Sequence, residues 1–178
     1  MNDETKDCFK NAKKAEEKGL KHKGLIVMEP DDKKSEEYIK KAKMNLELCE
    51  IYKEKGIDYK IPEEWFYTMY YCALAILSKF GIESRSQRCT AAFLRYIKDE
   101  GIIDLDQNFI ERITVHKEKS EESDVDKREE ARYGSSIKSE EIESQYELMN
   151  DFCKRCINQT EEIVYSDRKF KIPEELLE

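Results

Sequence analysis

The amino-acid sequence predicts an all-α protein: an up-and-down bundle of four to five main helices with a short N-terminal helical extension. Its 6 glycines and 3 prolines fall where helices would begin or end. Between them, apolar residues recur at spacings of three and four, which place them on one helical face. No segment shows the sustained alternation expected of a half-buried strand. We expect a lysine-rich helix and linker at 1–30, the bundle at 31–166 and a tail at 167–178.

The composition is that of a folded, strongly solvated chain. Its 178 residues suffice for one domain with a core, and 39% hydrophobic residues are too many for a disordered chain. Because the net charge is -8, any RNA contact would need a local basic patch. The longest apolar stretch, Trp65–Leu77, is too short and too polar to span a bilayer. The first 24 residues are charged throughout, so we expect no signal peptide and a cytoplasmic protein with 6 free cysteines.

The first long helix is marked at both ends. Pro30 precedes Asp31 and Asp32, whose side chains can cap a helix start. The helix is expected to run to about Lys55. Gly56 ends it because glycine adopts the left-handed conformation at low cost.

The next two helices are marked in the same way. Pro62 suits the first turn of a helix, where its missing N–H would be unpaired anyway, and Gly81 ends that helix. Either Ser84 or Ser86 opens the third helix, which stops at Gly101.

Two further helices complete the expected bundle. Asp104 or Asp106 opens a fourth, Gly134 breaks the chain, and Ser139 caps the last long helix. Alternating steps of four and three give this last helix one continuous apolar seam, as in bundle packing. The seam comprises Ile142, Tyr146, Met149, Cys153, Cys156, Thr160 and Ile163.

Cys153 and Cys156 form a CxxC motif that could bind zinc or cycle as a redox pair. A structural zinc site needs about four ligands, and the chain has no second CxxC pair. Both cysteines also lie on the apolar seam, where a cysteine acts as a small hydrophobe, so core packing is favoured. With only two histidines, His22 and His116, and no phosphate-binding glycine motif, we predict no metal and no cofactor.

Two polar patterns are candidates for chemistry. Arg112 and His116 stand one turn apart, so an arginine could hold a phosphate while a histidine moves a proton. Arg128, Arg132 and Tyr133 end a highly charged run before the last helix. Spacing alone favours solvated charge in both places.

A short set of residues carries a resemblance to a known family. They are Tyr70-Tyr71-Cys72-Ala73-Leu74, Leu77, Gly81-Ile82-Glu83-Ser84-Arg85-Ser86, Phe93 and Gly101. Downstream, Arg128-x-x-x-x-Tyr133-Gly134 resembles an Arg-x-x-Ala-Asp-Tyr-Gly pattern. Together they resemble the small prokaryotic subfamily of HEPN domains, over roughly residues 32–165.

The resemblance implies a helical up-and-down bundle that forms a symmetric homodimer. Many HEPN proteins are metal-independent ribonucleases whose Arg and His residues from both protomers share a cleft. Others are toxins paired with a minimal nucleotidyltransferase in two-gene toxin–antitoxin modules.

The sequence departs from the catalytic pattern of that family. Tyr133 stands where active members carry His, and Gln87 stands where many relatives carry His. An imidazole exchanges a proton near neutral pH, whereas a tyrosine hydroxyl is a poor base there. The resemblance thus gives catalytic candidates Arg128, Tyr133 and, through the other protomer, His116, with Arg132, Arg112 and Gln87 as binding candidates.

Three functions remain open at this point. The first is a dimeric RNA- or nucleotide-related component of a HEPN/nucleotidyltransferase toxin–antitoxin-like system with a degenerate catalytic motif. The second is an active metal-independent endoribonuclease. The third is a non-catalytic helical adaptor that binds another protein and does not act on RNA.

Overall fold

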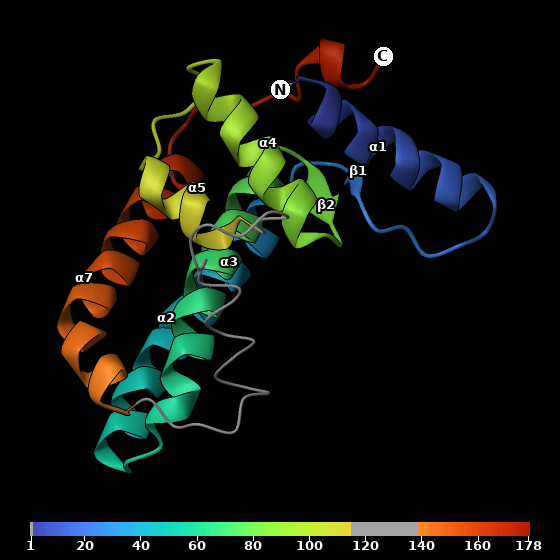
Figure 1. Ribbon diagram of the computed structural model, residues 1–178. Helices are drawn as coiled ribbons and strands as arrows, with labels where there is room; N and C mark the ends of the chain where they lie inside the picture. The colour runs from blue at the N-terminus through green and yellow to red at the C-terminus, as the bar shows by residue number, and fades with distance from the viewer. Residues whose placement is uncertain (1, 115–138) are drawn as a thin grey trace.

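The computed structural model describes residues 2–114 and 139–178, and in these residues the chain is predominantly helical (Figure 1). The predicted all-α fold class is confirmed. The α-helices are α1 (Asn2–Glu17), α2 (Asp32–Glu54), α3 (Ile61–Lys79), α4 (Gln87–Asp99), α5 (Gln107–Ile113) and α7 (Ser139–Val164). Two short strands, β1 (Leu25–Val27) and β2 (Ile82–Ser84), and two 3₁₀ turns, η1 (Asp58–Lys60) and η2 (Glu174–Leu176), complete the described elements.

Helix α3 is the centre of the bundle. It lies beside α2, packs against α7, and also contacts α4 and α5 (Figure 1). Its apolar side chains point to several neighbours because the helix is covered on most sides; those fully buried include Phe66, Met69, Cys72, Ala73, Ile76 and Leu77. Across the described residues, no helix combines the length and the apolar character that crossing a bilayer needs.

The helix ends follow the local chemistry of the sequence. The backbone N–H of Lys34 donates to Asp31 Oδ1 at 2.9 Å, which caps α2. Gly56 has a φ of +67° just after the other end of that helix. Of the alternatives left open by the sequence, Ser86 caps α4 and Asp106 caps α5.

The N-terminal extension is fastened to the bundle by a disulfide between Cys8 of α1 and Cys89 of α4. The phenyl rings of Phe9 and Phe93 pack edge to face beside it, with centroids 6.4 Å apart. The expectation of six free thiols is wrong for this pair. Free thiols therefore no longer support a cytoplasmic location, which stays a prediction.

The two strands were not expected from the sequence. β1 and β2 pair antiparallel, with Leu25 opposite Ser84 and Val27 opposite Ile82. Each strand has three residues, too few to show alternation. Gly81 permits the pairing, because its φ is +75° and a Cβ atom there would lie 2.5 Å from the Met28 carbonyl oxygen.

The expected C-terminal tail packs against the bundle. The ring of Phe170 stacks on Phe80 with centroids 4.7 Å apart. The Tyr96 hydroxyl donates to Glu175 Oε1 at 2.5 Å, and Leu176 is buried. The tail thus covers one end of α3 and α4.

The CxxC cysteines lie in the core, as the sequence predicted. Cys153 and Cys156 are buried thiols on α7, and Cys72 of α3 is a third. Burial raises the pKa of the Cys156 thiol and raises the pKa of Cys72 to about 12. The thiols of Cys156 and Cys72 therefore stay protonated at neutral pH, and all three cysteines pack as small apolar groups.

One buried carboxyl gives the stability a pH dependence. Glu64 is buried between α2 and α3, where Asn45 Nδ2 donates to its Oε2. Burial raises the pKa of Glu64, and the Asn45 hydrogen bond opposes that rise. The pKa of Glu64 is higher in the folded state than in the unfolded state. The contribution of this carboxyl to the free energy of unfolding is therefore largest below its unfolded-state pKa. It is lost as pH rises through the folded-state pKa.

Replacing Glu64 with Gln is therefore expected to stabilise the protein at pH 8 but not below about pH 4. The amide keeps an acceptor for Asn45 and carries no charge. Thermal unfolding of the wild type and of Glu64→Gln across this pH range measures the difference. Glu37→Gln, at an exposed position of α2, is the control. A difference in melting temperature between Glu64→Gln and the wild type that does not grow with pH would contradict the raised pKa of Glu64.

Candidate functional site

Only part of the predicted site falls on the described residues. His116, Arg128, Arg132 and Tyr133 lie outside them, so their roles stay predictions. Arg112 and Gln87 lie inside, on α5 and α4 respectively.

The predicted helical pairing of Arg112 with His116 stays a prediction, because His116 lies outside the described residues. Helix α5 ends at Ile113, and Thr114 has extended backbone angles of φ -78° and ψ 133°. The Thr114 hydroxyl donates to the Ile110 carbonyl at 2.6 Å, and Arg95 Nη2 donates to that hydroxyl at 3.0 Å. These bonds hold Thr114 at the end of α5.

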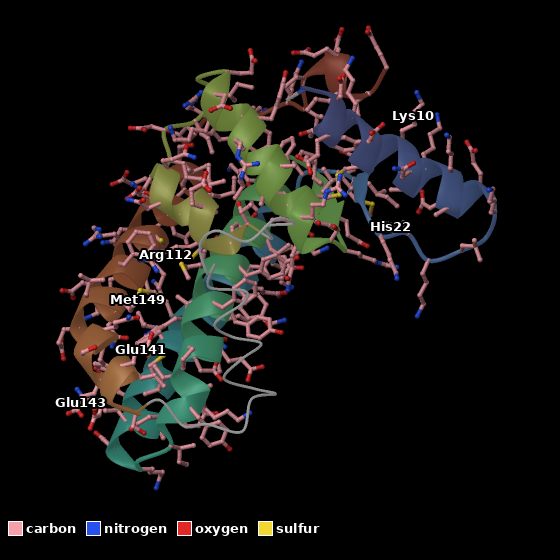
Figure 2. All side chains as sticks on the ribbon, in the orientation of Figure 1. Lys10, His22, Arg112, Glu141, Glu143 and Met149 are labelled. Atoms are coloured by element: carbon pink, nitrogen blue, oxygen red, sulfur yellow. A yellow bond between two sulfur atoms is a disulfide. The ribbon has the colours of Figure 1, made fainter. Side chains whose placement is uncertain are left out.

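Arg112 lies in the last turn of α5, where that helix meets α7 (Figure 2). Its guanidinium carbon is 4.9 Å from the centroid of the Phe152 ring on α7. The guanidinium carbon of Arg155, one turn further along α7, is 5.3 Å from the same centroid. Two arginines thus share one aromatic ring, an arrangement that orders both guanidinium groups.

The seam between α5 and α7 fixes this arrangement. Asp106 caps the start of α5, and its backbone N–H donates to Gln159 Oε1 on α7 at 3.2 Å. Near the arginines, burial raises the pKa of the Cys156 thiol and the charge of Asp106 adds to that rise, while the charges of Arg155 and Arg112 oppose it. The two positive charges therefore lie together over the buried surface of α7.

The arrangement suits an anion with several oxygen atoms. Guanidinium groups can match phosphate oxygens two at a time. Phe152 is buried, Arg112 is partly buried and Arg155 is exposed, as is the neighbouring Lys154. The α5–α7 arginine pair, meaning Arg112 and Arg155 on Phe152, thus forms a small patch of two positive charges on an acidic protein, with the carboxylate of Asp106 nearby.

Gln87 lies in another region of the molecule. It is the first residue of α4 after the Ser86 cap, and its neighbour Arg88 pairs with Glu4 of α1 at 2.7 Å. Arg95, which hydrogen-bonds to Thr114 just after α5, lies about 12 Å further along α4. Gln87 thus belongs to the end of α4 that faces α1, and the structure does not bring it to Arg112.

The sequence contained a signal for this patch. Phe152 and Arg155 stand three residues apart on the last predicted helix, a spacing that places them on one face. Among the described residues, no group of three or more His, Cys, Asp or Glu side chains is placed to hold a metal ion.

Comparison with known proteins adds no assignment to this geometry. The sequence matches no protein-family model and no curated protein. The candidate site therefore depends on the contacts of this chain alone.

Proposed function

We propose that the protein is a HEPN-type helical bundle that binds the phosphate groups of RNA or of a nucleotide at the α5–α7 arginine pair. It acts as the binding component of a two-protein system of the toxin–antitoxin type, as a homodimer with a minimal nucleotidyltransferase as partner. Catalysis is weak or absent. The observation that carries the proposal is the pair of guanidinium groups held on the Phe152 ring.

Two further features support a binding role. The order and lengths of α2, α3, α4 and α7 fit the up-and-down bundle that the resemblance implies. In the sequence, tyrosine and glutamine stand at Tyr133 and Gln87, where active relatives carry histidine. Arg128, the arginine of that motif, can bind phosphate, but without a histidine as general base it does not move a proton.

Neutralising the arginine pair tests the proposal. The double variant Arg112→Gln/Arg155→Gln is expected to bind a uridine-rich RNA at least about tenfold more weakly, since each charge-assisted hydrogen bond contributes about 1.5–3 kcal/mol. Glutamine keeps much of the apolar stem and loses the charge. Fluorescence anisotropy measures the affinity, and a second titration with ATP distinguishes a nucleotide site from an RNA site.

Arg168→Gln is the matched control. The guanidinium carbon of Arg168 also lies over an aromatic ring, 4.8 Å from the centroid of Phe170, but this arginine does not contact Phe152, and its Nη2 donates to the Ile102 carbonyl at 2.9 Å. Equal affinity for the wild type and the double variant would overturn the proposal. Cleavage of the RNA in EDTA to a 2′,3′-cyclic phosphate would favour the endoribonuclease instead.

A further inference from the structure

The Cys8–Cys89 disulfide is the only bond among the 6 cysteines, all of which lie in the described residues. Small secreted domains that cannot build a sufficient core pair their cysteines densely. A chain of 178 residues can bury a core without such bonds, so this bond acts locally, on the segment that it joins to the bundle. The other cysteines are core thiols, each at most 1% exposed: Cys49, Cys72, Cys153 and Cys156.

Helix α1, which the bond fastens, lies at the edge of the fold. Its main contacts are with α4, β1 and the C-terminal turn η2, whereas the closest packing in the described chain is among α2, α3 and α7. Figure 1 shows α1 projecting from the side of the molecule that is opposite α7. Movement of α1 therefore leaves the packing of α2, α3 and α7 in place.

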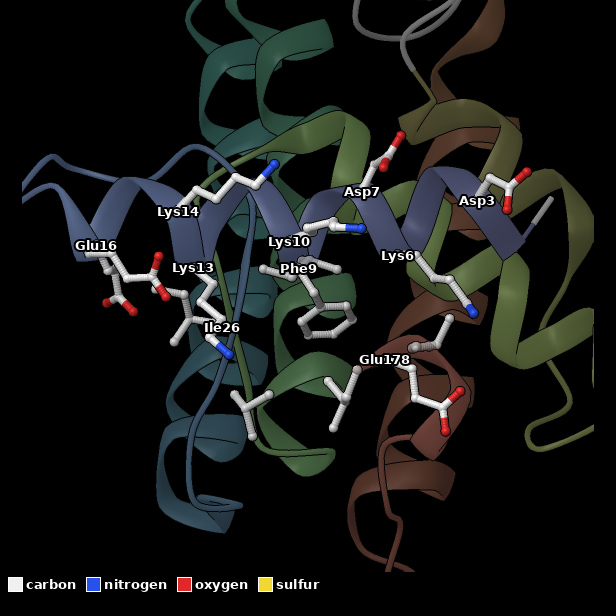
Figure 3. A pocket seen from close by; sticks show the side chains of 15 residues that line it. Asp3, Lys6, Asp7, Phe9, Lys10, Lys13, Lys14, Glu16, Ile26 and Glu178 are labelled. Carbon is white, nitrogen blue, oxygen red and sulfur yellow. The ribbon is translucent and has the colours of Figure 1, made fainter.

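The non-covalent contacts of α1 are sparse. A groove of about 880 Å³ lies between α1, β1 and the C-terminal residues, so part of the inner face of the helix has no close neighbour. Figure 3 shows Phe9 on the groove side of α1, between Lys6 and Lys13. A small buried face holds a helix only weakly on its neighbours. In the described part of α1 that face consists of Thr5, Cys8, Phe9 and Ala12.

An aromatic contact and an ion pair also join α1 to α4. The phenyl rings of Phe9 and Phe93 pack edge to face, and Arg88 Nε donates to Glu4 Oε1 at 2.7 Å. The arginine and the glutamate are accessible to solvent, so their ion pair contributes little to docking. A helix of 16 residues is also marginal by itself in water. Without the disulfide, we therefore expect α1 to exchange between a docked and a released state.

The two sulfur atoms of the bond lie in different electrostatic surroundings. Cys89 is the third residue of α4, and its backbone N–H donates to the Oγ atom of the capping Ser86 at 3.2 Å. The first turn of a helix stabilises a negative charge on a sulfur atom. Cys8 lies near the middle of α1 and follows Asp7, so it has no such stabilisation. When the bond breaks, the electron pair therefore goes more readily to the Cys89 sulfur.

We propose that the Cys8–Cys89 bond is a reversible exchange site for small thiols of the glutathione class, and that its reduction releases α1 from α4. Cys8 and Cys89 are 4% and 6% exposed, so a small thiol fits the site better than a folded protein does. The site is separate from the α5–α7 arginine pair and does not depend on RNA binding.

The exchange takes two thiol molecules. The thiolate of the first attacks Cys8 Sγ, the S–S bond breaks, and Cys89 Sγ leaves with the electron pair and takes up a proton. The thiolate of the second attacks the glutathione sulfur of the mixed disulfide, and Cys8 Sγ leaves and is protonated. Two electrons and two protons thus pass to the protein, and the two small thiols become one disulfide. Oxidised glutathione reverses both steps.

Mixtures of reduced and oxidised glutathione, added to the native full-length protein, test the exchange. Mass spectrometry after alkylation in denaturant is expected to count four thiols at the oxidising end and six at the reducing end. Structural disulfides resist reduction by glutathione, whereas an exchange site is half reduced within this range of mixtures. The mixed disulfide trapped by rapid acidification is expected on Cys8.

A brief pulse of hydrogen exchange measures the release of α1. Reduction is expected to speed deuterium uptake by the amides of α1 at least about tenfold, while the amides of α3 stay protected through the pulse. The double variant Cys8→Ser/Cys89→Ser is the control. Its α1 amides should exchange at the fast rate in every glutathione mixture.

Four results would overturn the proposal. They are a bond that stays oxidised in every glutathione mixture, an adduct on Cys89 alone, unchanged uptake by α1 on reduction, and loss of protection in α3 together with α1. The first would identify an inert structural bond, and the last would mean that reduction unfolds the whole bundle.

Discussion

Removing the disulfide with the double variant Cys8→Ser/Cys89→Ser is expected to lower the free energy of unfolding by about 4.5 kcal/mol. The two cysteines are 81 residues apart, so the bond closes a long loop and removes much of the freedom of the unfolded chain. The bond also holds Phe9 of α1 against Phe93 of α4. Urea unfolding of the variant and the wild type, without reductant, measures the loss.

Reductant supplies the control for this prediction. Dithiothreitol is expected to bring the wild type close to the variant and to leave the variant unchanged. The oxidised wild type, once denatured, should show four reactive thiols, those of Cys49, Cys72, Cys153 and Cys156. Six reactive thiols in the non-reduced protein would show that the disulfide does not form.

Phe93→Ala is expected to cost about 3–5 kcal/mol, the usual range for a buried phenylalanine truncated to alanine. Phe93 is fully buried, and its ring packs edge to face on Phe9 of α1 and on Phe80 of α3. Phe80 in turn stacks on Phe170 of the C-terminal segment. The cavity would thus loosen α1, α3, α4 and the C-terminal segment together, and the urea midpoint should fall accordingly.

Tyr165→Ala is the control for the aromatic truncation. Tyr165 is 54% exposed at the end of α7, so its loss is expected to change stability by less than about 0.5 kcal/mol. Comparable effects of the two variants would contradict the central position of Phe93 in the core.

The parts of the fold that the sequence predicts are those decided by local chemistry. Asp31 caps α2 through a backbone group three residues away, and Gly56 ends α2 by its own backbone angles. The apolar seam of α7 likewise depends only on spacing along one helix. Such features are visible in any window of a few residues.

The missed features join segments that are distant in the chain. Six cysteines can be joined in fifteen complete sets of three bonds, and no pattern near Cys8 or Cys89 selects their pairing. The pairing of β1 with β2 joins residues about sixty positions apart through strands of three residues. Contacts of this kind come from packing and leave no periodic trace in the sequence.

In the candidate site, too, local features were predictable and contacts between distant segments were not. Arg112 was identified from its own helix, but the ring on which it lies is forty residues away, on α7. The end of α5 at Thr114 depends on Arg95 of a different helix, which no pattern near residue 114 reveals. The sequence around Arg112 therefore identifies the charged group, but it does not identify the Phe152 ring that orders it.

The salt dependence of RNA binding by the oxidised full-length protein is the most direct test of phosphate recognition at the α5–α7 arginine pair. We expect the wild type to bind a uridine-rich RNA without cleaving it in EDTA, with an affinity that falls as salt rises. Arg112→Gln/Arg155→Gln should reduce the slope of log affinity against log salt by about 0.7 for each phosphate that the variant no longer neutralises. Identical slopes for the two proteins, or no RNA binding by the wild type at low salt, would contradict the proposed function.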